Sequence, residues 1–191
     1  MSGVFVAVVG PSGAGKDTLL QFARERLEGD ARYVFVRRVV TRPADRASED
    51  HDSLDLKQFE AAERAGAYAL SWDAHGLRYG LPAHIDDDIA AGRVVIANVS
   101  RRVLGDIAQR YSRTMVVAVS ASPEIIAERL AQRGREDAAA IGERLSRTVD
   151  APITADNSVR IDNSGPLVLA GERLVDVLVE AGQRQVWPQR A

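Results

Sequence analysis

A short glycine-rich run near the start of the chain has the residue types and spacing needed to hold phosphate. It reads GPSGAGKDT, and Gly10, Gly15 and Lys16 within it follow the pattern G-x-x-x-x-G-K. In such a loop the glycines let backbone N–H groups face the phosphates of a nucleotide, and the lysine reaches the β- and γ-phosphates. The sequence therefore predicts a nucleoside triphosphate site, made of Gly10, Pro11, Ser12, Gly13, Ala14, Gly15, Lys16, Asp17 and Thr18.

Asp17 departs from this pattern, because the residue after the lysine is normally a Ser or Thr whose hydroxyl meets magnesium. A carboxylate at this position repels the phosphates unless a cation lies between them. We interpret Asp17 as a ligand of Mg²⁺, directly or through a water, because this ion binds few carboxylates together with substrate phosphates and retained waters. Two alternatives stay open: Thr18 supplies the hydroxyl one position later, or Asp17 is a base that acts on the acceptor.

Strands and helices that alternate along the chain must position these residues. The stretch Val4–Val9 before the loop is apolar throughout, as is typical of a strand buried on both faces of a parallel sheet, and Lys16–Leu27 after it has a helical pattern. Further strands are expected at Tyr33–Val40, Arg93–Val99, Thr114–Ser120 and Ser158–Asp162. Further helices are expected at Pro82–Ala91, Arg101–Tyr111, Pro123–Arg133, Ala138–Val149 and Pro166–Ala181. This alternation predicts a three-layer α/β fold with a mainly parallel sheet.

Two regions interrupt the alternation. Residues 41–81 are polar and rich in charge, with one helix expected near Leu56–Ala65, and we interpret them as an insertion on the sheet rather than part of it. Residues 134–141, GREDAAAI, separate two arginine-rich helices and are interpreted as a lid. The length of 191 residues suits one core, so residues 1–191 are expected to form a single domain.

Composition narrows the class of protein. The chain is 46% hydrophobic and 27% charged with a net charge of −2, so we expect small-molecule substrates and neither nucleic acid nor a membrane as partner. It contains no cysteine, which excludes disulfides and thiolate metal sites and suits a reducing compartment. These features predict a cytoplasmic protein and leave the oligomeric state open.

Several dispersed segments carry a resemblance to a known family. Together with the loop, the segments VTRP, YGLP, SPEIIAERLAQRGRED and IGERL resemble the guanylate kinase family of P-loop kinases, in the same order over nearly the whole chain. The resemblance implies a P-loop core, an acceptor-binding insertion, an arginine-bearing lid, and phosphoryl transfer from ATP with Mg²⁺ to a second phosphorylated molecule.

The departures from this family concern the groups that read the base. Leu70 stands where guanylate kinases have a Glu that reads guanine, and His51, within EDHD, stands where they have a tyrosine. A leucine cannot accept hydrogen bonds from guanine, so a site built with it discriminates poorly for that base. The acceptor is therefore expected to carry phosphate and no purine.

A narrower resemblance fits this expectation. GPSGAGKD, SEDH, LSWDAHGLRYG, SPEI with RGRE, and NVSR are similar to segments of the ribose 1,5-bisphosphate phosphokinases of the PhnN type. Those enzymes use ATP to convert ribose 1,5-bisphosphate to 5-phosphoribosyl 1-diphosphate (PRPP) in phosphonate breakdown. In them NVSR reads NGSR, so Val99 is a departure. The alternatives are a guanylate or other nucleoside monophosphate kinase, and a guanylate kinase-like binding module without catalysis.

The resemblance also implies roles for single residues. Arg42, Arg46, His51, Tyr79 and Arg135 are the expected acceptor-binding residues. Arg133 and Arg144 match arginines that the family brings onto the transferring phosphates, and Asn163 lies where the family places its adenine loop.

The residue at position 98 relates the family pattern to the phosphate loop. Asn98 stands at or near the place of a family Asp close to the metal, so Asp17 is expected to replace that lost carboxylate. The acidic run Asp86–Asp88, by contrast, has its side chains pointing different ways early in an expected helix and is interpreted as structural, and Trp72 is interpreted as a packing residue.

Overall fold

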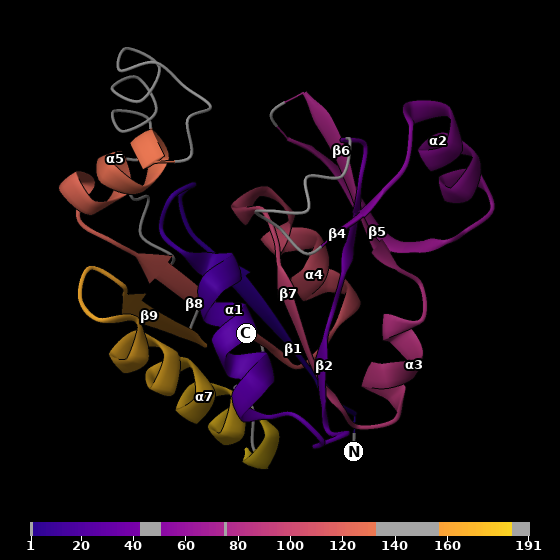
Figure 1. The fold of residues 1–191 in the computed structure, drawn as a ribbon. Coiled ribbons are helices and arrows are strands. Elements are labelled where there is room, and N and C mark those ends of the chain that lie inside the picture. Colours follow the sequence, from indigo (N-terminus) through magenta and orange to yellow (C-terminus); the bar gives the residue numbers. More distant parts are fainter. Residues whose placement is uncertain (1, 43–50, 75, 133–156, 185–191) are drawn as a thin grey trace.

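The computed structural model describes residues 2–42, 51–74, 76–132 and 157–184. Its main sheet has five parallel strands in the order β2-β7-β1-β8-β9 (Figure 1). Their bounds are β1 Val4–Val9, β2 Tyr33–Phe35, β7 Val94–Asn98, β8 Thr114–Ser120 and β9 Ser158–Asp162. The helices are α1 Lys16–Arg26, α2 Leu56–Arg64, α3 Ile85–Ala90, α4 Leu104–Arg110, α5 Pro123–Gln132 and α7 Leu167–Gln183, and a 3-10 turn, η1, spans Arg101–Val103.

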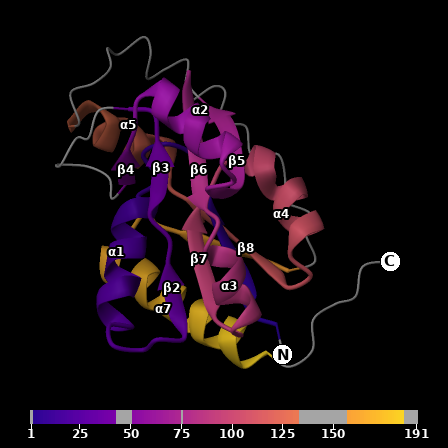
Figure 2. The same ribbon diagram turned by 90° about the vertical axis from the view of Figure 1, so that its right-hand side faces the viewer.

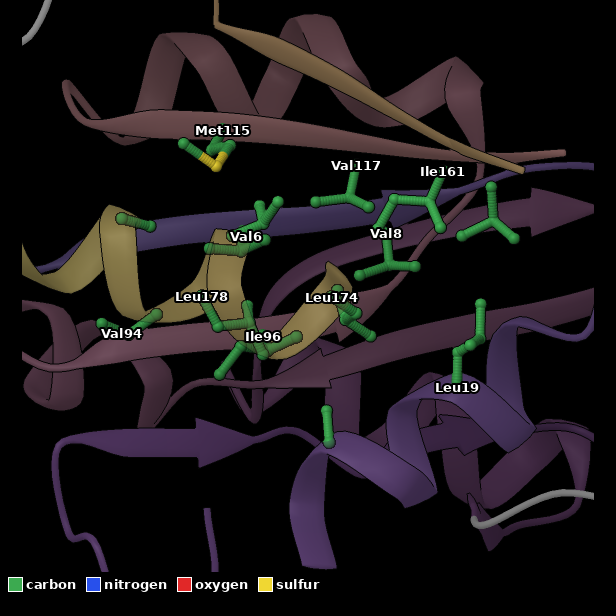
Figure 3. Packing of buried hydrophobic residues seen from close by; sticks show 14 of the residues in the cluster. Val6, Val8, Leu19, Val94, Ile96, Met115, Val117, Ile161, Leu174 and Leu178 are labelled. Carbon is green, nitrogen blue, oxygen red and sulfur yellow. The ribbon is translucent and has the colours of Figure 1, made fainter. Parts of the chain in front are cut away.

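One face of the main sheet is covered by α1 and α7 (Figure 1). Alternate residues of the central strand β1, among them Val6 and Val8, point to this face because side chains alternate along a strand. Figure 3 shows them packed with Leu174 and Leu178 of α7, and with Leu19 of α1 nearby. This cluster fixes α1, and with it the start of the helix that follows the phosphate loop.

The opposite face of the sheet is covered by α3 and α4, so the helices and the sheet form three layers. Phe5, Ala7 and Val9 of β1 point to this side and pack in a second cluster that includes Ile85 of α3 and Ile107 of α4. The predicted three-layer α/β fold with a mainly parallel sheet is confirmed.

A second sheet stands beyond the carboxyl ends of the main strands, with α2 beside it (Figure 2). Its order is β4-β3-β6-β5, with β3 Arg38–Val40, β4 His51–Ser53, β5 Tyr68–Ala74 and β6 Leu77–Pro82. The helix expected near Leu56–Ala65 is confirmed as α2, but the strands β4, β5 and β6 were missed. They were missed because the polar, charged composition of residues 41–81 hides strands that bury one face only.

The prediction of one continuous strand over Tyr33–Val40 is wrong. The chain leaves the main sheet after Val36, whose N–H donates to Ile96 O at 2.9 Å, and joins the second sheet at Arg38. An apolar run rich in β-formers predicts extended backbone, but it does not say which sheet each part pairs with.

Two helix boundaries also differ from expectation. Pro82 ends β6, so the helix expected over Pro82–Ala91 starts at Ile85, and the helix expected over Arg101–Tyr111 is divided into η1 and α4. The helix expected at Ala138–Val149 and the lid expected at 134–141 lie outside the described residues. Within the described ranges, no helix is long and apolar enough to cross a membrane.

Candidate active site

The phosphate loop joins β1 to α1, and Gly10, Gly13 and Gly15 in it have a positive φ; a side chain would collide most closely at Gly10 and Gly15. Gly10 has φ 151°, and a Cβ there would lie 2.2 Å from the carbonyl oxygen of Val119. Gly15 has φ 86°, and a Cβ there would lie 2.4 Å from Nδ2 of Asn163. A side chain at either position would collide with neighbours in a backbone region that L-residues rarely adopt. The loop shape is therefore specified by these two glycines.

Lys16 folds back over this loop. Its Nζ donates to the carbonyl oxygens of Gly10 and Pro11, at 2.8 and 2.9 Å. Gly15 is the N-cap of α1, so the first N–H groups of the helix and the ammonium group lie at the same place. A helix N-terminus with a lysine beside it attracts and binds phosphate oxygens.

Asp17, in the first turn of α1, meets two residues from different elements. Asn98, the last residue of β7, donates from Nδ2 to Asp17 Oδ1 at 2.7 Å. Arg38, the first residue of β3, places Nη2 at 3.7 Å from the same oxygen. The structure therefore brings together the carboxylate and the asparagine that the sequence analysis related to each other.

Arg38 was missed by the sequence analysis. It is only 9% exposed although it carries a full charge, and its guanidinium lies 5.8 Å from the ring centre of Tyr79. A signal was present, because two arginines interrupt the apolar run YVFVRRVV, and a charge inside such a run calls for a partner.

The residues around Asp17 fit a magnesium ion that is shared with a nucleotide. Both contacts that the described part of the chain makes with this carboxylate fall on Oδ1, which leaves Oδ2 to face a ligand. Within the described ranges, no three or more His, Cys, Asp or Glu side chains lie close enough together to hold a metal ion. Those residues therefore form no cation site made of protein ligands alone. A single carboxylate suits Mg²⁺, which draws its other ligands from phosphates and water.

One face of the second sheet carries the expected acceptor residues. His51 of β4 pairs with Arg38 of β3, and Tyr79 of β6 pairs with Val40 of β3, so their side chains share this face. His51 is buried, at 6% exposure, and Tyr79 stacks on Trp72 with ring centres 5.4 Å apart. Trp72 belongs to the apolar cluster beneath α3 and α4, so its predicted packing role is confirmed.

Leu70, the residue that replaces the guanine-reading Glu, lies on the same face of the second sheet. It pairs with Leu81 of β6 and packs against the same apolar cluster. Val99, which replaces a glycine of the family, is also buried there, and its N–H donates to Val8 O at 3.0 Å. Both departures are thus accommodated by packing.

Asn163, which follows β9, supports the phosphate loop. It is 2% exposed, and its Nδ2 donates to Ala14 O at 2.8 Å. Arg129 of α5 donates to Asn163 O at 2.9 Å and to Ala14 O at 3.4 Å, a structural contact that the sequence analysis did not expect. A pocket of about 280 Å³ opens beside these residues, lined by Gly13, Gly15, Thr18, Arg129, Gln132, Asn163 and Leu167.

The remaining predicted residues lie just after β3 or outside the described residues. Arg42 follows β3 and is half-buried, and Arg46, Arg133, Arg135 and Arg144 lie outside the described residues. Asp86 is structural, as expected: Arg110 and Tyr111 donate to it, and the Arg110 hydrogen bond holds the pKa of its carboxyl below the ordinary value.

Comparison with known proteins agrees with this geometry. A family model described as AAA domain matches residues 6–150. A ribose 1,5-bisphosphate phosphokinase PhnN from Brucella melitensis is 56% identical over 163 residues, which cover 85% of each chain. Another protein of that name, from Agrobacterium fabrum, is 44% identical over 181 residues, covering 94% of this chain and 99% of its own.

A solved structure supports the fold independently. The guanylate kinase from Anaplasma phagocytophilum superimposes with a TM-score of 0.73 at 16% identity, over 96% of this chain and 88% of its own. At that identity the likeness shows a guanylate kinase-like fold only. The acceptor has to be inferred from the residues of the site.

Proposed function

The chain belongs to the ribose 1,5-bisphosphate phosphokinases within the AAA-domain family, and from that premise we propose that it catalyses their reaction. An oxygen of the C1 phosphate of ribose 1,5-bisphosphate attacks the γ-phosphorus of ATP. The bond from that phosphorus to the β,γ-bridging oxygen breaks, and ADP leaves with the electron pair. The products are PRPP and ADP, in phosphonate catabolism.

The observation that carries the choice of acceptor is the packing of the half-buried Leu70 against an apolar cluster. The side chain at this position cannot accept a hydrogen bond from a purine, while the phosphate loop and Lys16 are intact. A kinase that keeps phosphate-binding residues but lacks a base-reading group selects an acceptor by its phosphates.

In this reaction Lys16 stabilises the charge that grows on the transferring phosphate. Asp17 and the nucleotide would hold Mg²⁺, which would supply positive charge that offsets the charge of the phosphates. Arg42, His51 and Tyr79 bind the acceptor, and so do Arg46 and Arg135. The resemblance assigns Arg133 and Arg144 to the transferring phosphates, and Asn163 holds the phosphate loop.

The chemistry of the acceptor favours the metal role of Asp17 over the base role. A phosphate monoester loses its second proton with a pKa near 6, so the attacking oxygen is already deprotonated at neutral pH. A base has no proton to remove there, unlike in a kinase that phosphorylates a hydroxyl group.

We also propose that residues 1–191 form one domain, because side chains of both sheets, such as Val95 and Trp72, belong to one apolar cluster. Both substrates are multiply charged phosphates that do not cross a bilayer unaided, so we place the reaction in the cytoplasm, where they are made.

A product assay tests the function. Purified protein is incubated with ATP, Mg²⁺ and either ribose 1,5-bisphosphate or GMP, and PRPP and GDP are measured. PRPP from the first mixture and little GDP from the second are expected. GDP without PRPP would make the protein a nucleotide kinase, and no turnover of ATP in either mixture would make it a binding module.

A further inference from the structure

We propose that Arg38 is the anchor for the C1 phosphate of the acceptor, the phosphate that attacks ATP. This inference rests on the proposed function and deepens it, because it assigns one of the two acceptor phosphates to one side chain. It begins from a buried guanidinium, 9% exposed, at the first residue of β3.

The burial of Arg38 calls for an anion beside it. A charge removed from water is costly unless hydrogen bonds and an opposite charge offset the loss. The carboxylate of Asp17 lies 3.7 Å from Nη2, which is near the outer limit of an ion pair and longer than a charge-assisted hydrogen bond. A phosphate oxygen, which also carries negative charge, would bind the guanidinium at charge-assisted hydrogen-bond distance and add to this compensation.

Arg38 also stands where the two substrates must meet. Asp17 directly follows Lys16, whose ammonium group lies on the phosphate loop, so the contact with Asp17 brings Arg38 to the transferring end of the nucleotide. Arg38 reaches this point from the second sheet, which is the acceptor side. The attacking and accepting atoms must approach to about 3–3.5 Å, and two phosphates at that distance repel each other. A fixed guanidinium between them offsets the repulsion.

Two stacked aromatic rings lie beside the guanidinium. It lies over the ring of Tyr79 at 5.8 Å, and Tyr79 is itself stacked on Trp72. A guanidinium has five N–H donors in a rigid fork that matches two oxygens of a phosphate.

The neighbouring Arg37 provides a matched control. Its side chain is 52% exposed, and its Nη2 lies 2.9 Å from Asp52 and donates to His51 O at 3.2 Å. Arg37→Gln therefore removes the same charge one residue away, from a side chain that is half-exposed.

Truncated ligands distinguish the two phosphates of the acceptor. Ribose 1-phosphate and ribose 5-phosphate are each used as inhibitors of PRPP formation by the wild type and by Arg38→Gln, Arg38→Lys and Arg37→Gln. We expect Arg38→Gln to weaken inhibition by ribose 1-phosphate about 10- to 100-fold, the loss typical of a hydrogen-bonded charged partner. Inhibition by ribose 5-phosphate and the KM for ATP should change less than about twofold. Arg38→Lys should recover part of the loss, and Arg37→Gln should behave as the wild type.

Several outcomes would overturn the assignment. Equal weakening of both inhibitors would indicate general damage to the site, and weakening of ribose 5-phosphate alone would place Arg38 at the other phosphate. A shifted magnesium requirement with unchanged inhibition would make Arg38 a positioning residue for Asp17. Failure of the wild type to form PRPP would instead reject the proposed function. Circular dichroism and thermal unfolding show whether Arg38→Gln is folded; if it is not, the Arg38→Lys comparison decides, with unchanged inhibition by ribose 1-phosphate counting against the anchor.

Discussion

Asn98, at the end of β7, donates a hydrogen bond from its side-chain amide to the carboxylate of Asp17 in the first turn of α1, across 2.7 Å. The two residues are 81 positions apart in the chain. The amide fixes one oxygen of Asp17 and so orients the other, which makes Asp17 and Asn98 a unit rather than two independent departures from the family pattern.

This pairing predicts a result for exchanging the two side chains. Asp17→Asn should raise the magnesium concentration for half-maximal activity roughly 10- to 100-fold, because a metal ligand is lost. The double variant Asp17→Asn, Asn98→Asp keeps one amide and one carboxylate at the same place and should recover part of that loss. Activity titrated with Mg²⁺ provides the measurement.

The control for the exchange is Asn98→Asp alone, which places two carboxylates against each other and should be worse than the double variant. If Asp17→Asn leaves the magnesium dependence unchanged, Asp17 is not a metal ligand.

Lys16 is expected to act on the transition state. Lys16→Ala should lower kcat about 100-fold or more while the protein remains folded, because the ammonium group stabilises charge that develops during transfer. Lys57, the other lysine of the chain, is exposed on α2 and serves as the control. Steady-state kinetics and circular dichroism are compared for both variants, and a folded Lys16→Ala with normal kcat would argue against the role.

Two helical glycines should respond to alanine with opposite signs. A Cβ on Gly171 of α7 would lie 2.5 Å from the ring of Phe22 in α1, so Gly171→Ala should lower the free energy of unfolding by about 1–3 kcal/mol. A Cβ on Gly105 of α4 has nothing within 4 Å, so Gly105→Ala should raise it by about 0.5–1 kcal/mol through helix propensity. Urea unfolding measures both, and a stabilising Gly171→Ala would show that α1 and α7 separate easily.

The ion pair between Asp86 and Arg110 should make the free energy of unfolding depend on pH in the acid range. Arg110 and Tyr111 donate to Asp86, and the folded protein holds the pKa of Asp86 below its ordinary value. The stabilisation is therefore present above the unfolded pKa of about 3.9 and is lost as pH falls through the folded pKa. Asp86→Asn should cost about 1 kcal/mol at pH 7, a small value because the pair is half-exposed.

Unfolding of Asp86→Asn and of the wild type is compared from pH 7 down to pH 3, and the difference should shrink below about pH 4. Asp87→Asn, at an exposed neighbouring carboxylate, is the control. A difference that stays constant with pH would show that the charge of Asp86 is not what stabilises the fold.

Local patterns in the sequence determined the nucleotide side of the protein. The spacing of Gly10, Gly15 and Lys16 predicted the phosphate loop, and apolar runs predicted β1 and β8 at Val4–Val9 and Thr114–Ser120, the bounds observed. These features are readable because a turn that needs glycine and a strand buried on both faces each leave a short, continuous signature.

Only the tertiary structure decided what surrounds Asp17. The break after Val36, the strands of the second sheet, and the approach of Arg38 depend on which strands pair and in what order. Pairing between distant segments is set by the burial of whole faces against one another, and no local run of residues records it. In the sequence, nothing distinguishes Arg38 from the other arginines as a phosphate-binding residue. It becomes a candidate only in the structure, where β3 places it beside Asp17.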